Sequence, residues 1–312
     1  MEWPVGVLHA VAWEHGQMSE LRWHPLLEQW VVVTAHRQDR PQTPSGWCPF
    51  CPASGRVPDY DVALYPNDFP AFSFDDPDAP GACDVVLYSP EHTRLPSELP
   101  IGQWEKIIAL WTRRTAELTS DPRIKHVMIF ENAGEAVGVT MPHPHGQIYA
   151  FPFVPPRIER ELASVSAHRQ KTGECLYCTI LADEQKDTRR IIAQNRNFVA
   201  FAPHFARFPY ETLIYMRRHT PALADLRPDE ARDFAEILSR MRKKYDALFG
   251  FPMPLMMVLH QSEHFYVEFL PLQRSAAKLK YLAAVESASW TFLDDVMPEQ
   301  AAEALRRTQP VW

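Results

Sequence analysis

A short run of the sequence, Pro142-His-Pro-His-Gly-Gln147, places three polar side chains at alternate positions. Alternate residues of an extended segment project to one side, so His143, His145 and Gln147 are expected to share a face. An unprotonated imidazole nitrogen is a nucleophile, and an amide can donate a hydrogen bond to a phosphoryl oxygen. The proline between the histidines and the glycine after them leave room for a phosphate against the backbone. The run predicts a site for attack on phosphorus, with a solvated polar loop as the alternative.

Four of the five cysteines occur as two Cys-x-x-Cys pairs, Cys48 with Cys51 and Cys175 with Cys178. Pairs at this spacing are typical of metal sites or of thioredoxin-like redox motifs, and no βαβ pattern supports the redox alternative. His92 and His143 would complete a tetrahedral set of two sulfurs and two nitrogens around the first pair, a set suited to structural zinc. Binding of His143 to a metal would also fix the segment that presents His145. Cys83 has no such neighbour and is predicted to be a core residue.

An internal repeat relates the two halves of the chain. His92 follows Cys48 by 44 residues, and His219 follows Cys175 by the same number. At an offset of 127 residues, the aligned residues are Leu87, Tyr88 and His92 with Ile214, Tyr215 and His219. Earlier in each half, at a slightly different offset, Asn67–Phe72 resembles Asn197–Phe201. The repeat predicts that each half passes from a Cys-x-x-Cys pair through strands to a long helix.

Two long amphipathic helices are predicted at the same offset. Their apolar positions are Trp104, Ile107, Leu110, Trp111 and Leu118 in the first half, and Ala231, Phe234, Ile237, Leu238 and Tyr245 in the second. A final strand is predicted after each helix, at Val127–Phe130 and at Met256–Leu259. Pro155, Pro156 and the polar stretch Ser164–Glu174 are predicted to mark the joint. The expected fold class is α+β with mostly antiparallel sheet, in two fused units at 1–160 and 161–312.

The repeat also predicts a second metal site and a chemical difference between the halves. The ligands of this site would be Cys175, Cys178, His219 and His264, in the order of the first set. In this mapping Tyr266 stands at the place of His145, and Glu268 stands at the place of Gln147. With no imidazole there, only the first half is expected to attack phosphorus. The alternative for the second cysteine pair is that both side chains are buried apolar residues.

Length and composition indicate a globular protein of about two domains. The chain has 312 residues and a mass of 35.9 kDa, and 46% of its residues are hydrophobic and 23% charged. A net charge of −7, from 32 basic and 39 acidic residues, provides no general field for a nucleic acid. No apolar run approaches the roughly 20 residues of a membrane span, and the N-terminus lacks a secretory pattern. The protein is expected to be cytoplasmic, without nucleic acid or membrane as a partner.

The ordered set of motifs resembles the galactose-1-phosphate uridylyltransferase family of the histidine-triad superfamily. The His-x-His-x-Gln run is accompanied by Ala35–Pro41, Cys48–Cys51, Asn67–Phe69, Ser89–His92, Glu131–Gly134, Gly138–Thr140 and Leu272–Ser275. The resemblance extends over about residues 20 to 300. It implies two fused histidine-triad-like units, zinc on the first Cys2His2 set, and a homodimer.

The resemblance implies transfer of a uridylyl group between UDP-glucose and galactose 1-phosphate through a covalent uridylyl-histidine. His145 would be the nucleophile, with its second ring nitrogen hydrogen-bonded to a backbone carbonyl, and Gln147 would stabilise the phosphoryl oxygens without promoting hydrolysis. The residues that match the family's substrate contacts are Arg37, Arg40, Gly138 and Thr140 for phosphate, Asn67, Asp68 and Asn132 for uridine and ribose, and Lys280 and Glu286 for the hexose.

The sequence departs from the family at the second metal site and at one sugar position. Better-known members bind a second metal through a glutamate and three histidines. Glu161, His260 and His264 match three of these ligands, and Tyr266 replaces the fourth. The Cys2His2 set competes for His264 and is favoured because both thiolates are present. Phe292 stands where the family usually has a sugar-binding glutamine. The alternative functions are an adenylyltransferase or phosphorylase acting on another nucleotide, and a nucleotide-binding sensor without catalysis.

Overall fold

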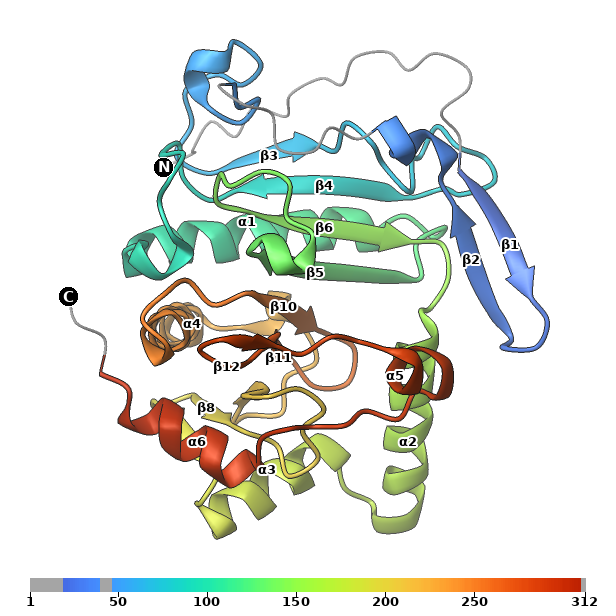
Figure 1. Ribbon diagram of the computed structural model, residues 1–312. Coiled ribbons are helices and arrows are strands. Elements are labelled where there is room, and N and C mark those ends of the chain that lie inside the picture. Colours follow the sequence, from blue (N-terminus) through green and yellow to red (C-terminus); the bar gives the residue numbers. More distant parts are fainter. Residues whose placement is uncertain (1–18, 40–46, 310–312) are drawn as a thin grey trace. The chain divides into compact units, whose positions relative to one another are not determined.

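The computed structural model describes residues 19–39 and 47–309, which form a mixed α+β protein with mostly antiparallel strands (Figure 1). The predicted fold class is confirmed. The chain divides into two compact units. Of the described residues, the first unit holds those up to 94, 106–129 and 140–164, and the second holds 95–105, 130–139 and 165–309.

The first unit contains an array of strands in the order β3-β4-β6-β5, of which β5 continues into the second unit after residue 129, and a separate antiparallel hairpin, β1-β2. The strands are β1 (Glu20–His24), β2 (Gln29–Val33), β3 (Ala63–Pro66), β4 (Ala82–Leu87), β5 (His126–Ala133) and β6 (His145–Phe151). Figure 1 shows β3, β4 and β6 side by side, as their backbone pairing requires. The unit also holds most of helix α1 (Ile101–Thr119).

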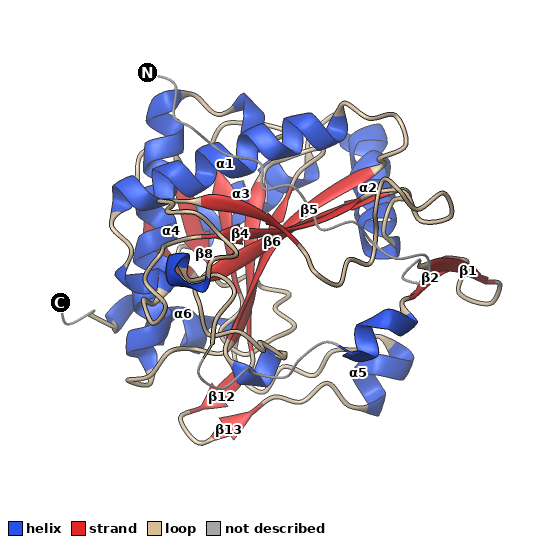
Figure 2. Cartoon of the chain, turned by 90° about the horizontal axis from the view of Figure 1, so that it is seen from above, coloured by secondary structure: helices blue, strands red, loops and turns tan. Residues whose placement is uncertain are grey.

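The second unit contains five strands in the antiparallel order β10-β11-β9-β8-β7. The strands are β7 (Ile191–Gln194), β8 (Phe198–Phe201), β9 (Thr212–Met216), β10 (Leu255–His260) and β11 (Tyr266–Pro271). The helices are α2 (Pro156–Thr172, which begins in the first unit), α3 (Leu176–Asp187), α4 (Pro228–Leu248), α5 (Ala284–Ser289) and α6 (Pro298–Arg307). Figure 2 shows β12 (Gln273–Ser275) and β13 (Lys278–Leu279) as a short separate ribbon.

Both predicted long helices are present, as α1 and α4. Trp104 and Trp111 of α1 are fully buried, and so are Phe234, Leu238 and Tyr245 of α4. Their spacing of four or seven residues places them on one stripe of each helix, which explains why the apolar pattern identified these elements. The predicted final strands are also present, as β5 and β10, each longer than predicted.

The polar stretch predicted to be a joint, Ser164–Glu174, is mostly helical. Helix α2 runs through it from Pro156 to Thr172. Proline is favourable at the first position of a helix, and no residue that breaks a helix follows it until Gly173. Gly173 adopts a left-handed conformation with φ +79°, which ends helices readily. The polarity of this stretch therefore reflects an exposed helix and not a loop.

The strands of the two halves correspond at a register one residue away from the sequence alignment. Leu87 lies opposite His145 in the β4–β6 pair, whereas Tyr215 lies opposite Tyr266 in the β9–β11 pair. Leu87 and Tyr215 also belong to the apolar clusters of their own units, and Ile214 does not. Leu87 therefore corresponds to Tyr215, because a shift of one residue moves a side chain to the other face of a strand. The loop that follows each strand absorbs the difference.

A second part of the repeat alignment is wrong. Asn67 follows β3, whereas Asn197 precedes β8. Ala63 and Tyr65 of β3 face the first apolar cluster, and Val199 and Phe201 of β8 face the second. The matching positions are therefore these strand residues, and the two asparagines occupy turns at opposite ends of equivalent strands.

Candidate functional site

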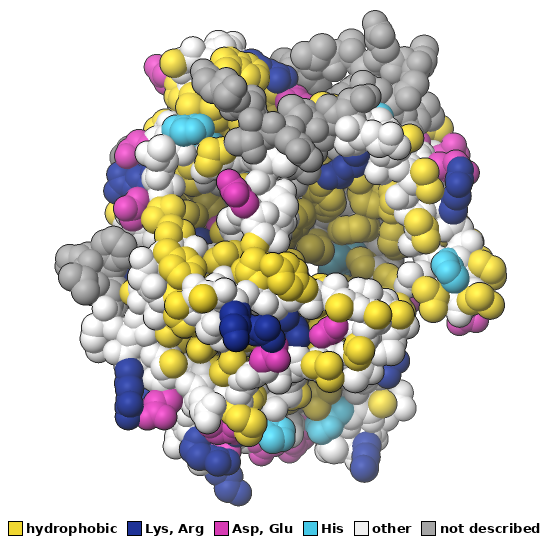
Figure 3. Space-filling model, in the orientation of Figure 1, with side chains coloured by type: hydrophobic (Ala, Val, Ile, Leu, Met, Phe, Trp, Pro, Cys, Tyr) yellow, Lys and Arg dark blue, Asp and Glu magenta, His cyan; other side chains and the backbone are white. Residues whose placement is uncertain are grey.

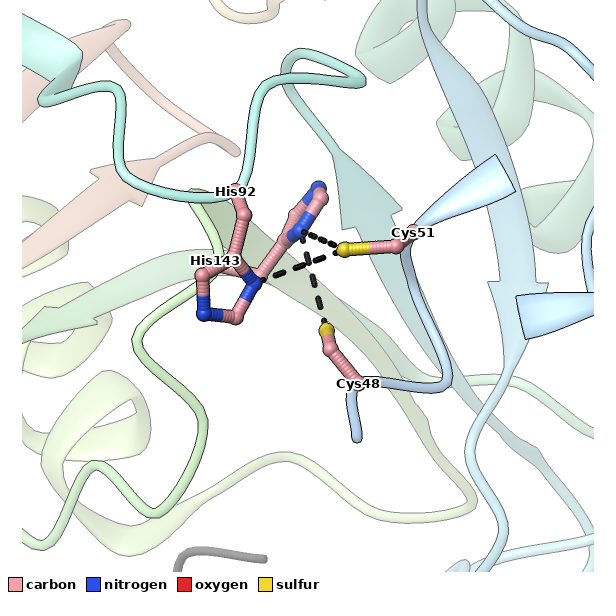
Figure 4. A group of neighbouring side chains, drawn as sticks. All are labelled: Cys48, Cys51, His92 and His143. Atoms are coloured by element: carbon pink, nitrogen blue, oxygen red, sulfur yellow. Dashed lines mark hydrogen bonds between the residues drawn. The ribbon is translucent and has the colours of Figure 1, made fainter. Parts of the chain in front are cut away.

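Two cysteines and two histidines of the first unit point toward one another (Figure 4). Cys48 and Cys51 lie just before a 3-10 turn, His92 lies in the loop after β4, and His143 lies just before β6. Their ligand atoms all lie within 4.8 Å of one another. The Nδ1 atom of His143 is 3.7 Å from both sulfurs, and Nδ1 of His92 is 3.5 Å from Sγ of Cys51. These four residues could hold a metal ion.

The spacing of these atoms suits a tetrahedral ion. Thiolate and imidazole ligands at about 2.3 and 2.05 Å from one ion, at tetrahedral angles, are separated by about 3.6 Å. The observed separations between nitrogen and sulfur, 3.5 to 3.7 Å, agree with that value. Two sulfurs and two nitrogens at such distances form a closed site of the structural type.

The second ring nitrogen of His143 is held by the protein. Nε2 lies 2.7 Å from the carbonyl oxygen of Ser89 and 2.8 Å from the hydroxyl oxygen of Tyr60. Because a carbonyl oxygen only accepts, Nε2 carries the ring proton, and Nδ1 presents its lone pair to the sulfurs. The Tyr60 hydroxyl is also 2.8 Å from the carbonyl oxygen of Phe50, between the two cysteines. Burial lowers the pKa of His143 to about 4 and raises the pKa of Cys48 to about 11. Without a metal, Cys48 and His143 are therefore neutral near pH 7, and metal binding must displace the thiol proton of Cys48.

The ring of His145 is fixed in one tautomer. Its Nδ1 atom lies 2.7 Å from the carbonyl oxygen of His143. Nδ1 must therefore be the protonated nitrogen, which leaves the lone pair on Nε2. The half-buried ring packs against Phe50 with 5.5 Å between centroids, and Phe50 also contacts the His143 ring at 6.0 Å. One aromatic ring thus packs on both His143 and His145.

The face of β6 that carries His145 also carries Gln147 and Tyr149, because alternate strand residues share a face. Gln147 is largely buried, with 9% of its surface exposed. Arg37 donates a hydrogen bond from Nη1 to the Tyr149 hydroxyl at 3.3 Å. One face of β6 therefore carries the His145 imidazole and the Gln147 amide. The Arg37 guanidinium is held at the same face by Tyr149. Arg40, the other predicted arginine, lies outside the described residues.

Two residues predicted to bind the nucleoside are engaged in local contacts in the first unit. The Asp68 carboxylate pairs with Arg56 at 2.9 Å and accepts a hydrogen bond from the Tyr65 hydroxyl at 3.0 Å. Oδ1 of Asn67 accepts a hydrogen bond from the backbone N–H two residues later at 2.9 Å. These contacts hold the turn after β3. Thr140 lies half-buried in the segment that leads to β6.

The remaining predicted substrate residues belong to the second unit. Asn132 lies in β5, and Gly138 ends a 3-10 turn with φ +78°, a conformation that favours glycine. Lys280 and Glu286 are buried and paired with each other, with Nζ 3.1 Å from Oε1. Their side chains fix the segment around α5. Phe292 packs on a neighbouring phenylalanine with 5.6 Å between ring centroids.

The second Cys2His2 group is assembled in the same way. Cys175 precedes α3, Cys178 lies in the first turn of α3, His219 follows β9, and His264 precedes β11. Nδ1 of His219 and Nδ1 of His264 lie 3.6 and 3.8 Å from Sγ of Cys178, and all four ligand atoms lie within 4.8 Å. Nε2 of His264 is 2.9 Å from the carbonyl oxygen of Met216, which fixes the tautomer as in the first group. Burial lowers the pKa of His264 to about 4.

At the place of His145, the second unit has a closed polar cluster. Tyr266 and Glu268 are 4% and 1% exposed. Glu268 accepts a hydrogen bond from Arg207 at 2.5 Å, and its other oxygen is 3.2 Å from Nε2 of His260. The His260 ring stacks on the Tyr266 ring with 4.3 Å between centroids. Protein side chains therefore fill this place.

The alternative ligands of a second metal have other partners. His264 belongs to the Cys2His2 group, and His260 contacts the Glu268 carboxylate. Glu161 pairs with Arg157 at 2.8 Å. Within residues 19–39 and 47–309, the two Cys2His2 groups are the clusters of ligating side chains that could hold a metal ion.

Glu211, buried beside Arg207, makes the stability of the second unit depend on pH. Its carboxylate accepts backbone hydrogen bonds from Arg207 and Phe208 at 2.6 and 3.0 Å. Burial raises the pKa of Glu211 from its usual 4.5 to about 7. A folded pKa above the unfolded one adds stability that is fully present below pH 4.5 and is lost as the pH rises through 7.

The substitution Glu211→Gln keeps an acceptor oxygen and removes the ionisation. The free energy of unfolding of the variant, relative to that of the parent, should therefore be higher at pH 8 than at pH 5, by on the order of 1 to 3 kcal/mol. Urea unfolding at both pH values measures this difference. The same exchange at the exposed Glu303 is the control and should show no change with pH. An equal difference at both pH values for Glu211→Gln would contradict the assignment.

Comparison with known proteins places the chain in a family. The N-terminal domain model of galactose-1-phosphate uridyl transferase matches residues 48–155, and the C-terminal domain model matches residues 161–311. A galactose-1-phosphate uridylyltransferase from Thermotoga maritima is 37% identical over 317 residues, covering 94% of this chain and 99% of that protein. This chain belongs to the galactose-1-phosphate uridylyltransferase family.

Solved structures agree with this membership in the galactose-1-phosphate uridylyltransferase family. A uridylyltransferase structure superposes with a TM-score of 0.86 at 32% identity, covering 93% of this chain and 98% of that one. An ADP-glucose phosphorylase from Arabidopsis thaliana has the same fold, with a TM-score of 0.76 at 24% identity, covering 95% and 100%. In the described part of the chain, no helix combines the length and apolar character needed to cross a membrane.

The motifs of the galactose-1-phosphate uridylyltransferase family identified ligands but not the residues that hold them. Tyr60 contacts Ser89 and His143, which are 29 and 83 residues away in the sequence. Such contacts depend on the folded chain and leave no local pattern. Phe50 could have been found, because it lies between two predicted ligands and its ring must pack beside them.

Proposed function

We propose that this protein transfers a uridylyl group from UDP-glucose to galactose 1-phosphate, giving UDP-galactose and glucose 1-phosphate. The observation that carries the proposal is the His145 ring, whose Nδ1 proton is donated to a backbone carbonyl, so that the lone pair lies on Nε2. Family membership supports the choice of substrates. The reaction is a double displacement through uridylyl-His145.

In the first step, Nε2 of His145 forms a bond to the α-phosphorus of UDP-glucose. The bond from this phosphorus to the bridging oxygen breaks, and glucose 1-phosphate leaves with the electron pair. In the second step, a phosphate oxygen of galactose 1-phosphate attacks the same phosphorus, and the bond to Nε2 breaks. The hydrogen bond from Nδ1 to the His143 carbonyl keeps the ring in the reactive tautomer in both steps.

Fixed hydrogen-bond donors would stabilise the negative charge on the phosphoryl oxygens. Gln147 would donate an amide hydrogen bond, and Arg37, held by Tyr149, would supply a positive charge. The further proposed substrate residues are Arg40, Gly138 and Thr140 for phosphate, Asn67, Asp68 and Asn132 for the nucleoside, and Lys280 and Glu286 for the sugar end. Binding at Asp68 would require its carboxylate to exchange Arg56 for a ribose hydroxyl.

We also assign zinc to both Cys2His2 groups. The donor set of two thiols and two imidazoles, at separations of 3.5 to 3.8 Å, fits zinc better than hard cations, which prefer oxygen ligands. When bound, zinc would supply structural cross-linking and no chemistry at phosphorus. In the first group it would hold His143, whose carbonyl oxygen orients the His145 ring.

The proposed organisation is a catalytic unit at 1–160 and a non-catalytic unit at 161–312, in a homodimeric, cytoplasmic enzyme. The limits of the matched family domains support the division near residue 160. Reduced cysteines that serve as ligands suit a reducing compartment. Figure 3 shows hydrophobic side chains gathered on the β1–β2 hairpin at the right, where Trp23, Leu26 and Trp30 are exposed and would suit a second copy of the chain.

Incubation with UDP-glucose and galactose 1-phosphate tests the proposed function. The expected products are UDP-galactose and glucose 1-phosphate, separated by anion-exchange chromatography. Turnover should be much slower when ADP-glucose replaces UDP-glucose and when glucose 1-phosphate is the only substrate supplied. Preferred turnover of ADP-glucose, or release of a nucleoside diphosphate, would replace the uridylyl assignment with phosphorylase or adenylyl chemistry.

Replacing Gln147 with histidine should increase hydrolysis of the uridylyl intermediate relative to transfer. An imidazole at this place can exchange protons with water, whereas the amide only donates a hydrogen bond. The overall rate should fall by about one to three orders of magnitude, as for other losses of one transition-state donor. The measurement is UMP released per UDP-galactose formed. An unchanged ratio would show that Gln147 does not protect the intermediate.

A further inference from the structure

A pocket opens directly onto the second Cys2His2 group. Its volume is about 870 Å³, within the range of pockets that bind small molecules. Three of the four ligands of this group line it: Cys175, Cys178 and His219. The other residues at its wall that matter here are Arg169, Glu174, Ala182 and Glu263.

The two groups differ in how the protein covers them. In the first group Cys48 and His143 are buried, with 8% and 0% of their surfaces exposed. In the second group only His264 is buried, His219 is exposed, and the two cysteines are half-buried. An ion in the second group would therefore have three ligands within reach of a molecule in the pocket.

The charge of the pocket favours a cation. Arg169 donates a hydrogen bond to Glu263 at 2.5 Å, so its charge is largely matched at the rim. Its guanidinium also interacts with the Cys175 thiol. Glu174 adds a second carboxylate, and its Oε2 atom is 3.4 Å from the Thr179 hydroxyl. Two carboxylates and two thiols that lose protons on metal binding outweigh one arginine.

We propose that this pocket is the port through which the second group exchanges its metal ion with solution. The ligands it admits are divalent ions of the zinc class and small multidentate chelators that carry them. Exchange is a substitution in which the chelator binds the ion and the bonds from the ion to the two thiolates and two imidazoles break. The two thiolates then take up protons from water, and the chelator releases to water the protons that it loses on binding the ion. The inference rests on the proposed zinc ligation and adds that the first ion is held while the second is exchangeable.

Metal release from the intact holoprotein tests the port. Protein carrying two zinc ions is mixed with 4-(2-pyridylazo)resorcinol, and free thiols are trapped with N-ethylmaleimide. One ion per chain should leave at least about tenfold faster than the other. Groups around the ligands of a metal site change metal affinity by about 10- to 100-fold, and tenfold is the lower end of that range. Peptide mass spectrometry should find the early label on Cys175 and Cys178. Equal release rates, or early label on Cys48 and Cys51, would overturn the port.

A pair of variants separates the pocket from general stability. Ala182→Trp should slow release of the fast ion because the new ring narrows the pocket that Ala182 lines. Asp183→Trp, one residue along α3 and also exposed, is the matched control and should leave the rate unchanged. Equal effects of both variants would contradict access through the pocket. Purified protein that binds no zinc but forms UDP-galactose would overturn the ligand assignment and the port, and the proposed transfer would still stand.

Discussion

Replacing His145 with alanine should reduce uridylyl transfer by on the order of ten-thousandfold or more, because the variant lacks the atom that forms the covalent intermediate. The fold should survive, since the ring is only half-buried and the metal ligands remain. The measurement is steady-state formation of UDP-galactose, with circular dichroism and zinc content as checks of folding.

The matched control for this substitution is His204→Ala, which removes an exposed imidazole of the second unit. This variant should transfer at the parental rate. If His145→Ala retained more than a few per cent of the parental rate while binding its zinc, another group would be the nucleophile. The closed cluster around Tyr266 would then have to be reconsidered, although its phenol is stacked on His260 and buried.

Changing both Cys48 and Cys51 to serine should remove one zinc ion per chain and abolish transfer. Without the ion, the Cys48–Cys51 segment, the loop with His92 and the segment with His143 lose the bonds that hold them together. The expected loss of stability is on the order of several kcal/mol or more, because the free energy of metal binding is coupled to folding. Transfer should fail because the His143 carbonyl, which fixes the His145 tautomer, is no longer held in place.

The corresponding change of Cys175 and Cys178 should also remove one zinc ion and lower the melting temperature, but some transfer should remain. The second unit presents no imidazole at the place of the nucleophile. Cys83→Ala is the control, since this buried cysteine belongs to a separate apolar cluster and should cost no metal. One zinc ion per parental chain, or equal loss of transfer in both double variants, would contradict the division of roles.

Spacing within single segments could be predicted from the sequence. The Cys-x-x-Cys pairs, the histidines that follow them and the apolar stripes of α1 and α4 are local patterns, and the structure places them as predicted. The strand register was predicted incorrectly because His219 follows Tyr215 by four residues, whereas His92 follows the equivalent Leu87 by five. A sequence alignment hides such a change when the motifs on both sides match.

Contacts between distant residues that belong to no motif could not be predicted. Tyr60 reaches His143, and Arg207 reaches Glu268, across 83 and 61 residues. Lys280 and Glu286 were assigned to the sugar from the family pattern alone, whereas their burial as a pair is a consequence of how the segment around α5 folds. A family motif identifies a residue's place in the chain but not which of its atoms remain free.

A single-turnover measurement without an acceptor sugar phosphate tests the proposed uridylyl-His145 intermediate most directly. The protein is mixed with excess UDP-glucose, released glucose 1-phosphate is counted per chain, and the modified peptide is identified by mass spectrometry. One equivalent of glucose 1-phosphate and one uridylyl group on the peptide that contains His145 are expected. Release without an adduct, an adduct on a residue other than His145, or two adducts per chain would contradict this intermediate.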